Sequence, residues 1–179
     1  MNNYGYQADL KEIYNKALGL YRKGNQDPST YFDADEKAFL ASIGARIQEV
    51  YDFVDDAERY GGPDYETFQL VMGVRRDFFL EVQKGVPSDS DIEESNLSAK
   101  RDAVRGILWL PRLIQKARAR LKGALPDSLM FGCGGDRKFL KTHDIHPADF
   151  LRATWAFLDD DEKMIDWVES RSKVKTEIV

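Results

Sequence analysis

The stretch DADEKAFLASIGARIQEVYDFVDDAERY, residues 33–60, decides the fold class. Its apolar side chains recur at steps of three and four residues, which places them on one stripe of a helix. They are Phe39, Leu40, Ile43, Ile47, Val50, Tyr51, Val54 and Ala57. Asp33 and Glu36 form a capping-box pattern at the start, and Gly61–Gly62–Pro63 ends the stretch. Residues 33–60 therefore predict one long amphipathic helix.

The same periodicity continues outward in both directions. Before the stretch, a stripe from Leu10 to Tyr21 predicts a helix that ends near Gly24. After it, helix starts are expected at Pro63, Pro111, Asp136, Pro147 and Asp159 or Asp160. No strand pattern is visible. The chain is therefore expected to be all-α, a multi-helix, bundle-like protein with two packed helical halves.

The segment VPSDSDIEESNLS, residues 86–98, is the best candidate for a boundary, because it is polar and nearly free of large apolar side chains. We therefore expect an N-terminal helical half over residues 1–86, a linker over 87–98 and a C-terminal helical half over 99–179.

Composition sets broad limits on function. The chain has 179 residues, of which 42% are hydrophobic, and a formal charge of −5. A single cysteine excludes an internal disulfide framework. No apolar run approaches the roughly 20 residues of a membrane helix, and no secretory signal is visible at the start. A cytoplasmic location without membrane insertion is the expectation, and the oligomeric state is left open.

Three segments of the second half carry a resemblance. They are WLPRLIQKARARLKG, FGCGGDRKFLKTHDIHPADFL and DDDEKMIDWV. Together they resemble a bacterial family known only as a domain of unknown function, numbered 5069, over about residues 105–170. The first half looks like the N-terminal part of a longer subgroup of that family. The resemblance implies membership, but no activity, cofactor or catalytic residue comes with it.

Helix 110–122 is the first functional candidate, because it carries five basic residues and no acidic one. They are Arg112, Lys116, Arg118, Arg120 and Lys122. Helical geometry places Arg112 and Lys116 opposite the apolar stripe. The helix could bind an anion or a nucleic acid. Alternatively, its cations pair with the acidic first half of the chain or are simply solvated.

The glycine-rich loop 132–138 is the second candidate, since glycines let backbone N–H groups approach a ligand closely. The expected function is non-catalytic binding of an anionic small molecule or a protein partner. The anion would lie between helix 110–122 and this loop. Its binding residues would be Arg112, Lys116, Gly134, Gly135 and Arg137. The alternative is a purely structural turn, in which the glycines allow a tight turn and Cys133 is a small core residue. The Asp136 carboxylate could also fill the anion-attracting position itself.

Cys133 supports a different function, that of an enzyme or redox sensor in which the thiol works with His143 or His146. That chemistry needs the sulfur within hydrogen-bond reach of an imidazole. The same three residues are one ligand short of a closed structural zinc site, so no metal and no cofactor is predicted. Elsewhere, Arg75 or Arg76 is expected to be partly buried against a carboxylate such as Asp52 or Asp56.

Overall fold

Eight helices fall into two units along the described part of the chain. The computed structural model describes residues 3–174, with side chains as far as residue 172. It divides into a first unit, Met1–Pro87, and a second unit, Ser88–Val179. Helices dominate both units, which confirms the all-α prediction. Within the described residues, no helix has the length and apolar character needed to cross a membrane.

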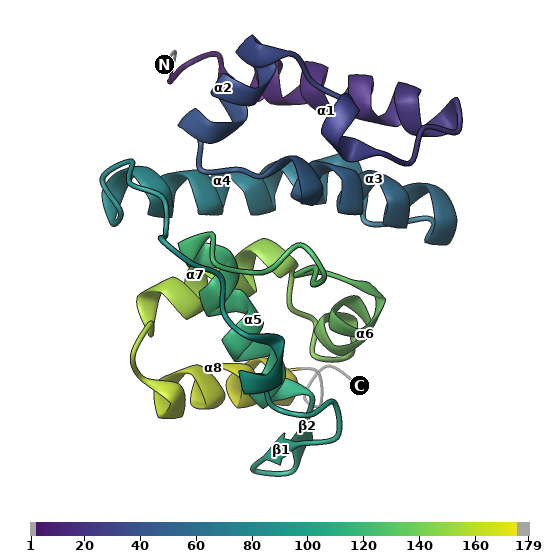
Figure 1. Ribbon diagram of the computed structural model, residues 1–179. Helices are drawn as coiled ribbons and strands as arrows, with labels where there is room; N and C mark the ends of the chain where they lie inside the picture. Colours follow the sequence, from purple (N-terminus) through teal and green to yellow (C-terminus); the bar gives the residue numbers. More distant parts are fainter. Residues whose placement is uncertain (1–2, 175–179) are drawn as a thin grey trace. The chain divides into compact units, whose positions relative to one another are not determined.

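The first unit is built on three helices around an aromatic core. Its elements are α1 (Tyr6–Arg22), the 3-10 turn η1 (Pro28–Thr30), α2 (Ala34–Ser42), α3 (Ile47–Tyr60) and α4 (Tyr65–Glu81). Helix α1 packs against both α3 and α4, and Figure 1 shows it lying along the row that they form. The ring of Phe68 lies 4.9 Å from that of Tyr14 and 5.2 Å from that of Phe53. All three rings are buried, so they hold the three helices together.

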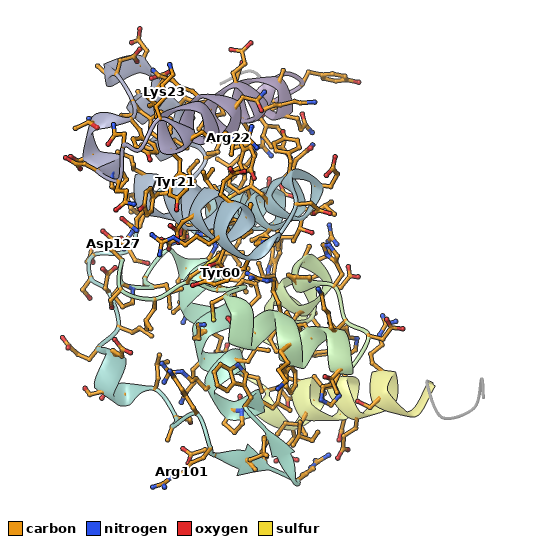
Figure 2. All side chains as sticks on the ribbon, turned by 90° about the vertical axis from the view of Figure 1, so that its right-hand side faces the viewer. Tyr21, Arg22, Lys23, Tyr60, Arg101 and Asp127 are labelled. Carbon is orange, nitrogen blue, oxygen red and sulfur yellow. The ribbon has the colours of Figure 1, made fainter. Side chains whose placement is uncertain are left out.

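A polar network joins the end of α1 to α3 at the edge of this core. Tyr21 donates a hydrogen bond to Asp55, and Arg22 forms a two-point ion pair with Glu58, with N···O distances of 2.8 and 3.0 Å. Tyr21 and Arg22 are labelled in Figure 2. The hydrogen bond from Arg22 lowers the pKa of Glu58 below its ordinary value.

The prediction of one helix over residues 33–60 is wrong, because the chain breaks at Gly44. Helix α2 ends at Ser42, Gly44 adopts a left-handed conformation with φ +68°, and the Ala45 N–H bonds back to the Leu40 carbonyl. This is the bonding of a helix-ending Schellman turn. A Cβ atom on Gly44 would lie only 2.5 Å from Cγ of Phe79 in α4. A new helix, α3, begins at Ile47. The apolar spacing therefore continues across a break between two helices.

Two helix starts in this unit test the capping predictions. The capping box at α2 is confirmed, since Asp33 accepts from the Glu36 N–H and Glu36 accepts from the Asp33 N–H. Helix α4, however, does not start at Pro63. Asp64 is its N-cap and accepts from the Thr67 N–H at 2.8 Å. The side chain of Asp64 therefore sets this helix start.

Arg75 is a buried cation in the core of the first unit, with only 2% of its surface exposed. Its guanidinium donates to the side-chain oxygen of Gln83 at 2.7 Å and lies 5.1 Å from the ring centre of Phe79. Burial, and secondly the charge of Arg46, lower the pKa of Arg75 to about 10. The expected burial is confirmed for Arg75, although no carboxylate pairs with it among the described residues. Its neighbour Arg76 is also buried and does pair with a carboxylate, that of Asp77, at 2.9 Å.

The second unit is arranged around α5. Its elements are the 3-10 turn η2 (Glu94–Asn96), β1 (Ala103–Val104), β2 (Ile107–Leu108), α5 (Leu110–Lys122), α6 (Gly134–Thr142), α7 (Pro147–Ala156) and α8 (Asp161–Val174). Helix α5 packs against α7 and against the hairpin, and α8 packs against α7. The core of the second unit includes Leu110, Leu113, Ala117, Leu121, Phe131, Leu140, Phe150, Leu151 and Met164.

Helix ends in the second unit follow the sequence closely. Helix α5 starts one residue before Pro111 and ends at Gly123, which has φ +66°. Pro147 opens α7 as predicted. Asp160 accepts from the Lys163 N–H at 3.0 Å and so caps the start of α8. Proline, glycine and aspartate therefore mark these boundaries through their ordinary backbone roles.

The segment 88–98, expected to be part of a linker, is bonded to α5 and its C-terminal end. Ser88 donates to the Lys122 carbonyl, and the Ile92 N–H donates to the Ala124 carbonyl at 2.8 Å. Further along, the Ser98 N–H donates to the side chain of Gln115. These bonds place the segment in the second unit, where it covers part of α5.

A short hairpin contradicts the expectation that the chain has no strand. Strands β1 and β2 have two residues each and pair antiparallel, with Ala103 opposite Leu108. The turn between them consists of Arg105 and Gly106, which have φ +50° and +80°. Two consecutive positive φ values give the tight turn that matches strand twist. Two-residue strands are too short to produce an alternating sequence pattern.

Arg105 ties this hairpin to α8. Its guanidinium contacts the carboxylates of Glu162, Asp166 and Glu169, which follow one face of the helix. Hydrogen bonds to Asp166 and Glu162 raise the pKa of Arg105 above its ordinary value. A turn residue thus makes the contacts that anchor the hairpin.

The change Arg105→Ala should release the hairpin from α8. We expect amide hydrogen exchange at Trp109, whose N–H bonds to the Asp102 carbonyl at 3.1 Å, to become several-fold faster. The difference from the unmodified protein should shrink in high salt, because these charges are exposed. Arg101→Ala is the matched control, since Arg101 extends from the chain next to the hairpin (Figure 2). Equal exchange in the two variants would contradict the anchoring role.

Candidate functional site at the amino end of α6

Three of the five cations of α5 are buried, contrary to the sequence analysis. Arg112, Lys116 and Arg120 have 8%, 2% and 2% of their surface exposed. The prediction that Arg112 and Lys116 lie opposite the buried face is wrong. It fails because α5 is covered by the segment 88–98 and the hairpin as well as by α7. A helix enclosed on several sides buries polar positions too, and they then need partners.

Asp136 is the partner of Lys116. The Lys116 nitrogen lies 2.6 Å from a carboxylate oxygen of Asp136. The Asp136 side chain is 0% exposed and the Lys116 side chain 3% exposed. The Asp136 carboxylate also accepts from the Trp109 indole N–H at 2.9 Å and from the Gly132 N–H at 2.9 Å. Three donors therefore satisfy one buried carboxylate, as a buried ion pair requires.

The prediction that Asp136 caps α6 is also wrong. The N-cap of α6 is Cys133, which makes no side-chain capping bond, and Asp136 lies inside the first turn. Its side chain points inward to α5 rather than back along the backbone of its own helix. This direction is decided by the buried ammonium of Lys116, which no local sequence pattern reveals.

Cys133 lies beside this ion pair. Its sulfur is 3.5 Å from the Lys116 nitrogen, and the residue is partly exposed. The structure therefore brings together the thiol of the N-cap, a buried ammonium and a buried carboxylate. The lysine is the group that sequence reasoning did not associate with the cysteine.

The first turn of α6 remains open on its outer side. Gly134 and Gly135 are exposed, and a Cβ atom on Gly134 would lie 4.0 Å from the nearer guanidinium nitrogen of Arg137. The other terminal nitrogen of Arg137 donates to the Gly132 carbonyl at 2.8 Å. The guanidinium is therefore held close to the start of the helix.

Gly135 is required by packing on its other side. A Cβ atom at this position would lie 2.6 Å from the indole ring of Trp109. The indole in turn is fixed by its bond to Asp136. The two glycines thus differ: a Cβ atom on Gly134 would meet only the Arg137 guanidinium, at 4.0 Å, whereas Gly135 leaves space for Trp109.

Arg112 and Arg118 also have carboxylate partners within the second unit. Arg112 donates to the Ser98 carbonyl at 3.0 Å and lies 3.6 Å from the Glu94 carboxylate. Arg118 forms an ion pair with Asp161 at 2.5 Å. For these two cations, as for Lys116, the partner carboxylates belong to the second unit itself.

The two histidines lie at the opposite end of α6 from Cys133. His143 is the residue that ends the helix, so about 14 Å of helix separates it from the N-cap. Its ring nitrogen Nδ1 contacts the hydroxyl of Ser172. His146 caps α7, where its Nδ1 accepts from the Ala148 N–H at 3.2 Å. The structure therefore pairs Cys133 with Lys116 and not with His143.

Residues 94–178 match the family model described as a domain of unknown function (DUF5069). This confirms the resemblance inferred from the sequence and covers the whole candidate site. Comparison with curated proteins and with solved structures gave no match. In the described part of the chain, no group of three or more His, Cys, Asp or Glu residues could hold a metal ion.

Proposed function

We propose that the second unit is a non-catalytic binding module that receives an anionic group at the amino end of α6. The observation that carries the proposal is the open first turn of this nine-residue helix, which has no side-chain cap, with Arg137 held beside it. Free N–H groups and the helix dipole both favour negative charge at this position.

The proposal assigns different roles to the five residues expected from the sequence. Gly134 and Gly135 supply N–H groups, and Arg137 supplies a cation. Arg112 and Lys116 instead hold the site in place, because each already contacts a protein carboxylate. Arg137 is the cation that a ligand would meet directly.

A small anionic group fits this site better than a nucleic acid. Of the cations on α5, only Arg118 and Lys122 are not buried, so the helix does not present a continuous basic surface. A nucleic-acid interface needs several accessible phosphate contacts. One helix end with one guanidinium suits a single phosphate or carboxylate of a small molecule or protein partner.

Titration with inorganic phosphate tests the proposal by following backbone amide NMR signals. We expect saturable shifts of the Gly134 and Gly135 signals. The change Arg137→Ala should weaken phosphate binding by about tenfold, because a hydrogen bond to a charged group contributes about 1.5–3 kcal/mol and 1.4 kcal/mol corresponds to tenfold. The dissociation constant from the titration is the measurement.

Arg152→Ala is the matched control. Arg152 is an exposed arginine of the same unit that pairs with Asp149 one turn earlier in α7. Its removal should leave phosphate binding at α6 unchanged. The proposal is wrong if the shifts do not saturate, or if Arg137→Ala and Arg152→Ala bind phosphate as well as the unmodified protein does.

A further inference from the structure

We propose that Cys133 and Lys116 form a reversible covalent bond when the protein meets hydrogen peroxide. The bond joins Sγ of Cys133 to Nζ of Lys116 as a sulfenamide. It is independent of anion binding at α6, because it uses the inner contacts of Cys133 rather than the open turn.

The geometry supplies both reacting atoms. Sulfur and nitrogen are 3.5 Å apart before any reaction, and Lys116 is almost completely buried. Among the described residues, the hydrogen-bond partners of this ammonium are Asp136 and the sulfur. A lysine fixed by a buried ion pair cannot move away, so its nitrogen stays beside the sulfur.

Cys133 is partly exposed at the start of α6, and in this scheme peroxide enters from that side. The species that attacks peroxide is a thiolate. In the structure Sγ lies 3.5 Å from the Lys116 nitrogen.

The reaction proceeds in two balanced steps. The thiolate attacks one peroxide oxygen, the O–O bond breaks, and hydroxide leaves. Sulfur is thereby oxidised by two electrons to sulfenic acid, and peroxide is reduced. The Lys116 nitrogen then attacks sulfur, so that the S–N bond forms and the S–O bond breaks. The ammonium releases two protons, which convert the two departing hydroxides into two waters.

Asp136 is placed to assist the second step. The nitrogen becomes nucleophilic only after it loses a proton, and the nearest acceptor is the Asp136 carboxylate at 2.6 Å. Asp136 is a positioning and proton-accepting residue in this scheme. Since Cys133 is the sole cysteine of the sequence, an intrachain disulfide is impossible, and Lys116 offers the intramolecular alternative.

Mass spectrometry of the full chain after peroxide treatment tests the proposal. We expect a monomer lighter by about 2 Da, because the new bond replaces two hydrogens. Tryptic digestion without reductant should yield one joined peptide containing Lys116 and Cys133. Dithiothreitol should separate it into two unmodified peptides, because a thiol attacks sulfur and frees the amine.

Three variants provide the controls. Cys133→Ser should abolish the joined peptide. Lys116→Arg keeps a cation for Asp136 but removes the amine, so Cys133 should go on to sulfenic and higher acids; a thermal melt checks that it is folded. Lys138→Arg changes an exposed lysine of α6 and should leave the joined peptide intact. The proposal is overturned if the folded, unmodified protein yields only oxygen adducts on Cys133, a disulfide-linked dimer or an unchanged Cys133.

Discussion

Replacing Asp136 with asparagine is expected to lower the free energy of unfolding of the second unit by about 3–5 kcal/mol, the range for removing one partner of a buried ion pair. The Lys116 ammonium would remain buried without a counter-charge, because both side chains lie inside the unit. Trp109 and the Gly132 N–H would also have to share a weaker acceptor. Urea unfolding followed by tryptophan fluorescence measures the change.

The fluorescence signal is specific to the second unit, since Trp109, Trp155 and Trp167 all lie within it. Asp159→Asn is the control, because it removes the charge of an exposed aspartate in the same unit. Lys116→Met combined with Asp136→Asn should be less destabilising than the sum of the single changes, because the two charges disappear together. Equal stability of Asp136→Asn and Asp159→Asn would contradict the central role of the ion pair.

Replacing Gly44 with alanine is expected to destabilise the first unit by about 2–5 kcal/mol. A left-handed backbone costs an alanine about 1–2 kcal/mol, and overpacking a core costs about 1–3 kcal/mol. Both apply here, since φ is +68° and the new Cβ atom would meet Cγ of Phe79 at 2.5 Å. The turn at Gly44, which follows α2, could then no longer lie as close to Phe79 of α4. Thermal unfolding followed by circular dichroism measures the change.

Gly61→Ala separates the two causes. Gly61 has nearly the same backbone, with φ +69°, but nothing lies within 4 Å of a Cβ atom at this position. Its replacement should therefore show only the backbone strain. If Gly44→Ala destabilises the protein no more than Gly61→Ala does, the close approach of Gly44 to Phe79 is not a packing constraint.

Local signals predicted most of the helices because their causes are local. The capping box of Asp33 and Glu36 needs only residues of one turn, and Gly123 and Pro147 act through their own backbones. The break at Gly44 escaped prediction because the apolar spacing on either side of it is compatible with one helix. Gly44 itself, with φ +68°, is a local helix-ending glycine like Gly123.

The candidate site was predicted in position but not in its internal contacts. The sequence pointed to helix 110–122 and loop 132–138, and the structure does bring Lys116 next to Cys133 and Asp136. The periodicity argument assumed that α5 buries a single face. In the structure α5 is covered on several sides, so Lys116 is buried. A buried ammonium requires a counter-charge, and the Asp136 carboxylate therefore points inward to pair with it.

The close contact between Gly135 and the Trp109 ring has a consequence for substitutions at both positions. A side chain at position 135 would displace the indole, and the displaced indole would no longer donate to Asp136. Neither position can change size alone without disturbing the buried ion pair. Substitutions at the two positions are therefore expected to be energetically coupled, so that a larger residue at 135 and a smaller one at 109 together cost less than the sum of the two single changes.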